Sequence, residues 1–346
     1  MTRNVRLVED RITLKYGTGG GAMRALIEQV FSRGLGDASG SEVGLADMDD
    51  GAAIRVGDRY LVLATDSHVV KPISFPGGDI GRLAVCGTVN DLAMMGATEP
   101  LALSCAAVLE DGFLRADLEA IWESIRESCK EAGTTVVTGD TKVMGHGEVD
   151  GLVLNTTGVA LTKRVVRDSG LRPGDKILVT GTMGDHGLAI MATRNELALD
   201  TTLESDVAPL NSLVRRVLDV GGDGIVAMKD PTRGGLSSAL HEMAEKSRVG
   251  VVLDEAAIPM REEVRAVGEL LGIDPLVSAN EGKAVVGLRP EVADAVLDAV
   301  RAHPQGRNAA IIGESVEERP GFVVLDTGYG SRLLSEAEGE LLPRIC

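Results

Sequence analysis

The stretch TDSHVVKPISFPGGDIGRLAVCGTVNDLAMMGA, residues 65–97, decides how the first half of the chain folds. It begins at the end of an apolar run and passes through a loop rich in Pro and Gly. It continues into residues 79–97, whose apolar spacing predicts a helix. Upstream, residues 52–56 and 60–66 predict two strands joined by a turn at Gly57-Asp58. Strands that feed a long helix indicate a mixed α/β unit.

The sequence on the C-terminal side of this stretch extends the same mixture. Strands are predicted over residues 101–109, 134–140 and 149–161. An amphipathic helix is predicted over 115–133. It is expected to end at Gly133, because glycine favours a helix C-cap. Strand and helix patterns then alternate through 171–335, which predicts a second α/β unit.

These patterns predict four segments in the chain. Residues 1–37 form an N-terminal glycine-rich segment, in which a short helix is predicted near 23–33. Residues 38–168 form the first domain, and residues 169–335 form the second. Residues 336–346 are predicted to be a flexible, polar tail with no packed element of its own.

Composition excludes several classes of function. The 346 residues are 44% apolar and 25% charged, which is typical of a folded chain, and the formal net charge is −17. Such a charge repels nucleic acid and anionic membrane surfaces, so neither is an expected partner. No apolar stretch is long enough for a membrane span, and the N-terminus has no signal-peptide core, so we expect a cytoplasmic protein.

Acidic residues beside predicted strand ends suggest a metal site. Asp50 precedes a strand, Asp66 and Asp140 end strands, and Asp91 lies within the predicted helix 79–97. Carboxylates that face loops are ligands that Mg²⁺ prefers, with nucleotide phosphates completing the shell. The alternative is that each Asp ends its strand and caps a turn. Four such positions in one domain favour the metal.

Glycine-rich segments could handle phosphate, although no P-loop pattern occurs. GTGGGAM (17–23) precedes a helix and could cradle an anion with its backbone N–H groups. DPTRGGL (230–236) and GTMGDHG (181–187) have the same loop-to-helix form, but each could equally be a tight turn. Lys142 follows Asp140 by two residues and could neutralise a phosphoryl group, or it could be a solvated surface lysine.

Two further segments carry reactive side chains. In ANEGKAV (279–285), Glu281 and a lysine flank a glycine and could act as an acid/base pair, or they could be paired surface charges. Of the four cysteines, three lie in apolar or helical segments and are predicted to be core residues, and no pair has zinc-finger spacing. Cys346 is the last residue. A tail of about 11 residues can extend roughly 35–40 Å, so its thiol could carry a covalent group into a distant site.

The block 65–97, together with GDTKVM, GTMGDHG, DPTRGG, NEGK and the terminal PRIC, resembles the HypE family of hydrogenase maturation proteins. The resemblance runs from Gly17 to Cys346. It implies membership of the superfamily of aminoimidazole ribonucleotide synthetase. That superfamily fold has two α/β domains, the first of which forms a dimeric β-barrel.

The resemblance also implies a reaction and a set of site residues. A carbamoyltransferase partner loads Cys346, and ATP drives dehydration of the carbamoyl group to a thiocyanate. An iron-carrying scaffold complex then receives the cyanide as a ligand for [NiFe] hydrogenase. Lys142 would stabilise the transferring phosphoryl group, and Glu281 would accept the amide proton. Mg²⁺–ATP would be held by the residues Gly19, Gly20, Asp50, Asp66, Asp91, Asp140 and Thr141, of which the four aspartates would bind the metal.

Two other functions remain open at the level of sequence. A small-molecule ATP-dependent kinase or ligase of the same superfamily would not need Cys346. A non-catalytic carrier would present Cys346 to partners without hydrolysing ATP.

Overall fold

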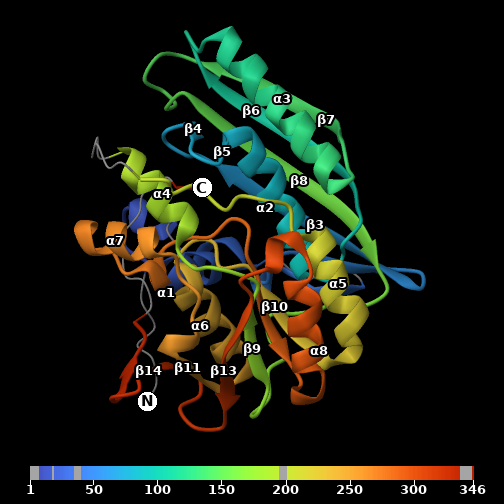
Figure 1. The fold of residues 1–346 in the computed structure, drawn as a ribbon. Helices are drawn as coiled ribbons and strands as arrows, with labels where there is room; N and C mark the ends of the chain where they lie inside the picture. Colours follow the sequence, from blue (N-terminus) through green and yellow to red (C-terminus); the bar gives the residue numbers. More distant parts are fainter. Residues whose placement is uncertain (1–7, 18, 35–39, 195–200, 336–344) are drawn as a thin grey trace.

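The computed structural model describes residues 8–17, 19–34, 40–194, 201–335 and 345–346. Two sheets organise it, one from each half of the chain (Figure 1). The first sheet has the strand order β1 (Ser41–Val43), β2 (Ala52–Val56), β3 (Arg59–His68), β8 (Leu152–Thr162), β6 (Pro100–Glu110) and β7 (Val136–Met144). The second has the order β10 (Ile225–Lys229), β12 (Val285–Leu288), β9 (Lys176–Val179), β13 (Ala310–Val316), β11 (Gly250–Asp254), β14 (Val323–Asp326) and β15 (Ser331–Leu333). A two-stranded sheet joins β4 (Ser74–Phe75) to β5 (Gly78–Asp79).

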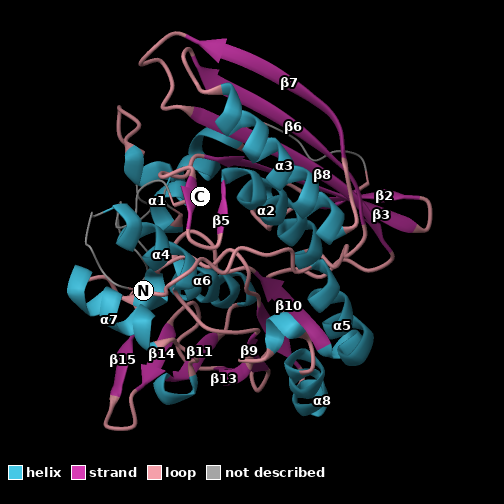
Figure 2. Cartoon of the chain, turned by 45° about the horizontal axis from the view of Figure 1, so that its top comes forward, coloured by secondary structure: helices cyan, strands magenta, loops and turns pink. Residues whose placement is uncertain are grey.

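Helices cover one face of the first sheet (Figure 2) and both faces of the second sheet. The first sheet carries α2 (Ile80–Met94) and α3 (Arg115–Ala132). The remaining helices are α1 (Gly20–Leu26), α4 (Asp185–Arg194), α5 (Asn211–Gly221), α6 (Gly235–Ser247), α7 (Glu262–Leu271) and α8 (Pro290–Arg301). A sheet covered by helices in each half is the α/β architecture that the sequence predicts.

Helix α2 is the central element of the molecule, because it packs on β3 and β8 and also against α5 of the second half. It is buried on nearly every side. Its glycines permit this close packing, since a Cβ at Gly81 would lie 2.5 Å from the carbonyl oxygen of Ile121 in α3. At its C-terminal end Met94 shares one apolar core with Leu210 and Leu213. The helix therefore fixes the two halves of the chain against each other.

Several predicted elements are confirmed. Strands β2 and β3 pair in antiparallel register around Gly57, whose φ is +65°. Helix α2 occupies the predicted stretch, and α3 ends at Gly133 in the left-handed conformation with φ +73°. The N-terminal helix begins three residues earlier than predicted, at Gly20, and continues as a π-helical turn over Ile27–Phe31.

One expectation needs correction. Asp140 does not end a strand but lies in the middle of β7, which pairs in parallel with β6. Within one chain the six strands of the first sheet form an open sheet with β7 as one of its edges, so the barrel of a dimer stays a prediction. The predicted tail lies outside the described residues except for Ile345 and Cys346. These two are docked against the molecule, with Ile345 only 4% exposed.

Across the described residues, no helix has both the length and the apolar character that a membrane crossing requires.

Candidate active site

A pocket of about 350 Å³ lies where the two halves meet, and carboxylates from both halves line it. Asp50 comes from the loop before β2, Asp66 from β3, and Asp91 from the buried helix α2. In the second half, Asp230 directly follows β10, and Glu281 precedes β12. Cys346 also lines this pocket. Strand ends and one helix thus bring together acidic residues that are far apart in sequence.

Burial and mutual repulsion raise the pKa values of these carboxyl groups. Burial, followed by the charge of Asp230, raises the pKa of Asp91 well above its ordinary value. Burial and then Asp50 raise the pKa of Asp230 to about 8. Burial, followed by Asp230 and Asp66, raises the pKa of Glu281 well above its ordinary value. Both causes disfavour the charged form, so the positive side chains at the pocket only partly compensate these three carboxyl groups.

Lys229 is a cation at the wall of this pocket, which Arg24 and Arg233 also line. Its ammonium lies 2.5 Å from Asp50 Oδ1, 3.3 Å from Glu242 Oε2 and 3.6 Å from Asp168 Oδ2. Burial alone lowers the pKa of Lys229, but these three carboxylates raise it well above its ordinary value. One lysine therefore balances part of the acidic charge and links β10 to the first half of the chain.

Three carboxylate oxygens at the pocket are buried without a partner. Within the described chain, Asp50 Oδ2, Asp230 Oδ2 and Glu281 Oε1 have no hydrogen-bond partner. A buried unpaired carboxylate is costly unless a cation or a proton compensates it. Among the described residues no three His, Cys, Asp or Glu side chains are already arranged to hold a metal ion. The donor set still fits a hard divalent cation whose remaining ligands are phosphate oxygens.

The last residue lies against the acidic wall of the pocket. The thiol of Cys346 lies beside Glu281, close enough for the two groups to interact electrostatically. Burial, followed by the charge of Glu281, raises the pKa of the Cys346 thiol well above its ordinary value. Arg233 faces the same residue, and Cys346 is the main cause of the raised pKa of Arg233. The docked sulfur is therefore protonated, and a carboxyl group stands beside it.

The glycine-rich N-terminal segment reaches the pocket at a single predicted residue. Gly19 lines the pocket with φ +83°, and a Cβ there would lie 3.1 Å from the carbonyl oxygen of Arg233. Gly20 is buried at the start of α1 and also has a positive φ, +68°.

Asp140, Thr141 and Lys142 lie elsewhere, exposed in β7. Asp140 is beside Ala106 in the register, on the face of the sheet turned away from the helices, and Lys142 pairs with it at 3.1 Å. Three strand spacings of about 4.8 Å separate β7 from β3, roughly 14 Å in all. Within one chain, Asp140 is therefore not placed to share an ion with Asp66, which lies on the helix-covered face with buried His68.

The three motifs that the sequence left ambiguous, 230–236, 279–285 and 181–187, differ in whether they line the pocket. At 230–236 the motif contributes Asp230 and Arg233 to the pocket, whereas Lys229, one residue before it, was missed by the sequence analysis. In 279–285 Glu281 lines the pocket, and Lys283 pairs with Asp206 at 3.0 Å. In 181–187 the histidine contacts the chain end rather than the pocket. No local signal marks Lys229, because a lysine at a strand end normally indicates solvent exposure.

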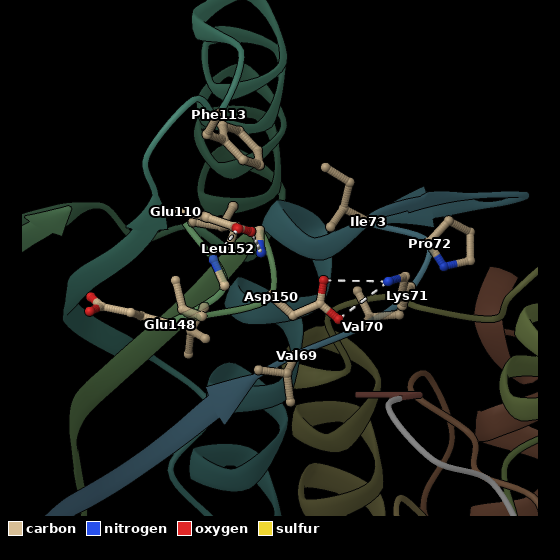
Figure 3. A pocket seen from close by; sticks show the side chains of 14 residues that line it. Val69, Val70, Lys71, Pro72, Ile73, Glu110, Phe113, Glu148, Asp150 and Leu152 are labelled. Atoms are coloured by element: carbon tan, nitrogen blue, oxygen red, sulfur yellow. Dashed lines mark hydrogen bonds and ion pairs between the residues drawn. The ribbon is translucent and has the colours of Figure 1, made fainter. Parts of the chain in front are cut away.

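A second and larger cavity, of about 840 Å³, lies in the first half of the chain (Figure 3). Apolar side chains such as Val69, Ile73 and Phe113 line it together with Glu110 and Asp150. Its lining is drawn from other residues than those predicted for the site.

The fold and the pocket together indicate a two-domain, ATP-dependent enzyme of the class related to AIR synthase. The family model for the N-terminal domain of AIR synthase-related proteins matches residues 48–162, and the model for the C-terminal domain matches residues 172–326. The carbamoyl dehydratase HypE of Bradyrhizobium diazoefficiens is 47% identical over 338 residues, which are 97% of this chain and 96% of the relative. The chain belongs to the HypE family of carbamoyl dehydratases.

Solved structures agree with this assignment. A HypE–HypF complex matches with a TM-score of 0.83 and 42% identity, covering 90% of this chain and 100% of that chain. HypE in complex with ATP matches with a TM-score of 0.80 and 42% identity, covering 97% of this chain and 100% of that chain.

Proposed function

We propose that this chain uses ATP to dehydrate an S-carbamoyl group on its own Cys346 to a thiocyanate, as a step in hydrogenase maturation. The observation that carries the proposal is the docked chain end, whose sulfur lies beside Glu281 at the wall of an acidic pocket. The names of the relatives, carbamoyl dehydratase HypE, and the solved complex of HypE with ATP support the same reaction.

The reaction needs phosphorylation of a poor leaving group and then removal of protons. ATP, as co-substrate, phosphorylates the carbamoyl oxygen and releases ADP. Loss of the remaining N–H proton with expulsion of phosphate leaves S–C≡N. Glu281 is the proposed proton acceptor, because it lies beside the sulfur, has an oxygen with no partner in the described chain, and has a raised pKa that makes its ionised form a stronger base.

The proposed magnesium ligands in the chain are Asp50, Asp66 and Asp91, and the structure adds Asp230 as a fourth candidate. Bound there, Mg²⁺ would neutralise charge on the phosphates of ATP. The unpaired oxygens of Asp50 and Asp230 favour this assignment. Gly19 is placed to cover the nucleotide from the N-terminal side of the pocket.

We assign Asp140, Thr141 and Lys142 to the pocket of a second copy in a homodimer. The face of the first sheet that carries Asp140 and Lys142 also presents Leu61, Leu63 and Val159, and in the described chain no helix covers this face. An apolar sheet face with an unpaired edge strand is a natural dimerisation surface. Two sheets joined in this way would form the barrel that a single chain leaves open.

The partners follow from the chemistry of the tail. A carbamoyltransferase must load Cys346, and the solved HypE–HypF complex is support for such a partner. An iron-carrying scaffold complex is the proposed acceptor of the cyanide.

Intact-mass measurement of carbamoylated protein tests the reaction. With ATP and Mg²⁺, the modified C-terminal peptide should lose the mass of one water, and without ATP it should not. A chain that lacks Cys346 should neither be modified nor consume ATP in this reaction. Unchanged turnover of a small-molecule substrate by the truncated chain would instead favour a kinase or ligase. Stable carbamoylated protein without ATP consumption would favour a carrier.

The dimer assignment has its own test. Lys142→Ala and Glu281→Gln chains should each be inactive alone. If the two residues act from different copies, an equal mixture after subunit exchange should recover about a quarter of the wild-type rate, because half the dimers then hold one intact site of two. A mixture that stays inactive would contradict the assignment.

A further inference from the structure

The docked chain end is held by contacts that do not involve its sulfur. The side chain of Ile345 is 4% exposed and joins a core cluster with Phe75, Ile190 and Val207. Its carbonyl oxygen lies 2.5 Å from Nε2 of His186, near the start of α4. Figures 1 and 2 both place the C-terminus between α4 and α2. The chain end is thus held one residue before the reacting group.

The hydrogen-bond pattern fixes which nitrogen of His186 carries the proton. A carbonyl oxygen can only accept, so Nε2 must donate to Ile345. Nδ1 lies 2.7 Å from the hydroxyl oxygen of Ser205, which can donate to it. The ring is then neutral, with its single proton aimed at the tail. Burial, which lowers the pKa of His186, agrees with this neutral form.

Three separate elements hold the ring in place. His186 belongs to α4, whose next residue donates its backbone N–H to the carbonyl of Ala279. Phe75 of β4 packs edge-on, with ring centroids 5.5 Å apart and planes at 85°. Ser205 is itself fixed, because its N–H donates to the carbonyl of Pro76 and its hydroxyl accepts from the N–H of Val207. The donor to Ile345 therefore exists before the tail arrives.

We propose that His186, oriented by Ser205, is a positioning residue that captures the carbonyl of Ile345 and thereby sets the sulfur of Cys346 beside Glu281. This inference rests on the proposed function and adds to it a pair of residues that position the chain end. On the proposed function a partner enzyme loads Cys346, and the loaded sulfur must then lie beside Glu281 for dehydration. A latch on residue 345 can hold the chain end in every chemical form of residue 346, because it does not touch the group that changes.

This position explains a motif that the sequence left ambiguous. The loop-to-helix segment 181–187 has the form of a phosphate-binding turn. In the structure its histidine binds a peptide carbonyl instead, with the ring fully buried. The segment therefore acts as a receptor for the chain's own end.

Alkylation of the free thiol measures docking without requiring catalysis. Docked Cys346 has a raised pKa and reacts slowly, whereas the thiol of a released tail has an ordinary pKa and reacts faster. Cys86, Cys105 and Cys129 are buried and report on the integrity of the fold in the same peptide-mass experiment. The full-length chain is treated with iodoacetamide, and labelling is followed at each cysteine.

For His186→Ala, labelling of Cys346 should rise by about 10-fold, while the other three cysteines stay protected. The ATP-dependent loss of water from the carbamoylated chain should slow by roughly 10- to 100-fold, because misplacing a reacting group by about 1 Å costs that much. His186→Gln retains an N–H donor at a similar reach and should restore most of both effects. ATP affinity should not change, since His186 lies outside the residues that line the pocket.

The outcomes distinguish the docking of the chain end by His186 from the dehydration reaction itself. Wild-type labelling of Cys346 in His186→Ala, with the other cysteines protected, overturns the latch. Faster labelling with an unchanged dehydration rate overturns the positioning role. If His186→Ala exposes the other cysteines, Ser205→Ala replaces it, and wild-type labelling in that variant is then the overturning result. If labelling responds as expected but wild-type protein never loses water with ATP, the latch stands and the proposed function fails.

Discussion

Two cavities of this molecule, the pocket with Glu281 and the larger cavity with Glu110, are both lined by carboxylates, but the fold surrounds those carboxylates in opposite ways. In the larger cavity of Figure 3, Glu110 accepts hydrogen bonds from the backbone N–H groups of Gly147 at 2.8 Å and Gly151 at 3.0 Å. These bonds lower the pKa of Glu110. In the smaller pocket, Asp230 and Glu281 each keep a buried oxygen without a partner in the described chain, and their pKa values are raised.

The difference teaches where to look for function. Carboxylates that accept hydrogen bonds from the protein do not require a ligand to compensate their charge. The size of the cavity around them therefore does not by itself indicate a functional site. Carboxylates that folding leaves buried and uncompensated require a cation, a proton or a substrate, and such groups concentrate at active sites. We therefore propose the smaller pocket as the functional site, although it has less than half the volume of the other.

Exchanging one carboxyl group in each cavity is the sharpest test of the comparison. Glu281→Gln removes the proposed base while keeping its shape, and nitrile formation should fall by at least about 10²-fold. Glu110→Gln, the matched control, should dehydrate carbamoylated Cys346 at the wild-type rate. Intact mass spectrometry of single-turnover reactions measures both. Full turnover by Glu281→Gln would show that the base assignment is wrong.

A second test removes the cation that links the halves. Lys229→Met would leave Asp50, Asp168 and Glu242 without their shared lysine, and breaking a buried ion network in this way costs about 3–5 kcal/mol of unfolding free energy. Urea unfolding at neutral pH without nucleotide measures the loss. A change below about 1 kcal/mol would mean that water already compensates the three carboxylates.

The carboxyl groups of the two cavities should also change the free energy of unfolding with pH in opposite directions. The pKa of Asp230 is raised from 3.8 to about 8, so its folded form keeps a proton that the unfolded chain loses. Its contribution to stability is complete below the ordinary pKa and is lost as the pH rises toward about 8. Glu110 has a lowered pKa, so its contribution is present above the ordinary value and is lost in acid.

Unfolding measured without divalent cations between pH 4 and pH 8 tests this sign. Asp230→Asn should flatten the decline of stability with rising pH by on the order of 2 kcal/mol. Glu110→Gln should leave that decline intact and should weaken only the dependence at acid pH. An unchanged slope in Asp230→Asn would indicate that Asp230 is already ionised in the fold.

Sequence patterns predicted the elements on which this comparison rests. Helix α2 and the β2–β3 pair follow from apolar spacing and from a turn glycine, which are local signals. Asp140 was misplaced because β7 continues past it to Met144 through residues with weak apolar alternation. Its face depends on pairing with β6, a strand that lies some thirty residues earlier, and no local pattern reports that register.

Part of the site was predictable from the residues themselves, because Asp50, Asp66 and Asp91 were metal candidates from their places beside strand ends and in the predicted helix. Asp91 and Glu281 were predicted, and the structure brings both to the pocket with Cys346. Lys229 was missed because a lysine at a strand end normally indicates solvent, and only tertiary packing surrounds it with carboxylates. The docking of Ile345 was likewise beyond prediction, since its partners His186 and Ser205 become neighbours only in the folded chain.

The smallest effect is expected at the ion pair on the rim of the larger cavity. Lys71 and Asp150 approach to 3.3 Å, but their side chains are 64% and 44% exposed. Solvent screens such a pair, and fixing two mobile side chains offsets most of the attraction, so its coupling energy should be below about 0.5 kcal/mol. A double-mutant cycle with Lys71→Ala and Asp150→Ala, followed by urea unfolding, measures it. A coupling above about 2 kcal/mol would break the contrast between the cavities, because the larger one would then also hold a strongly coupled charge.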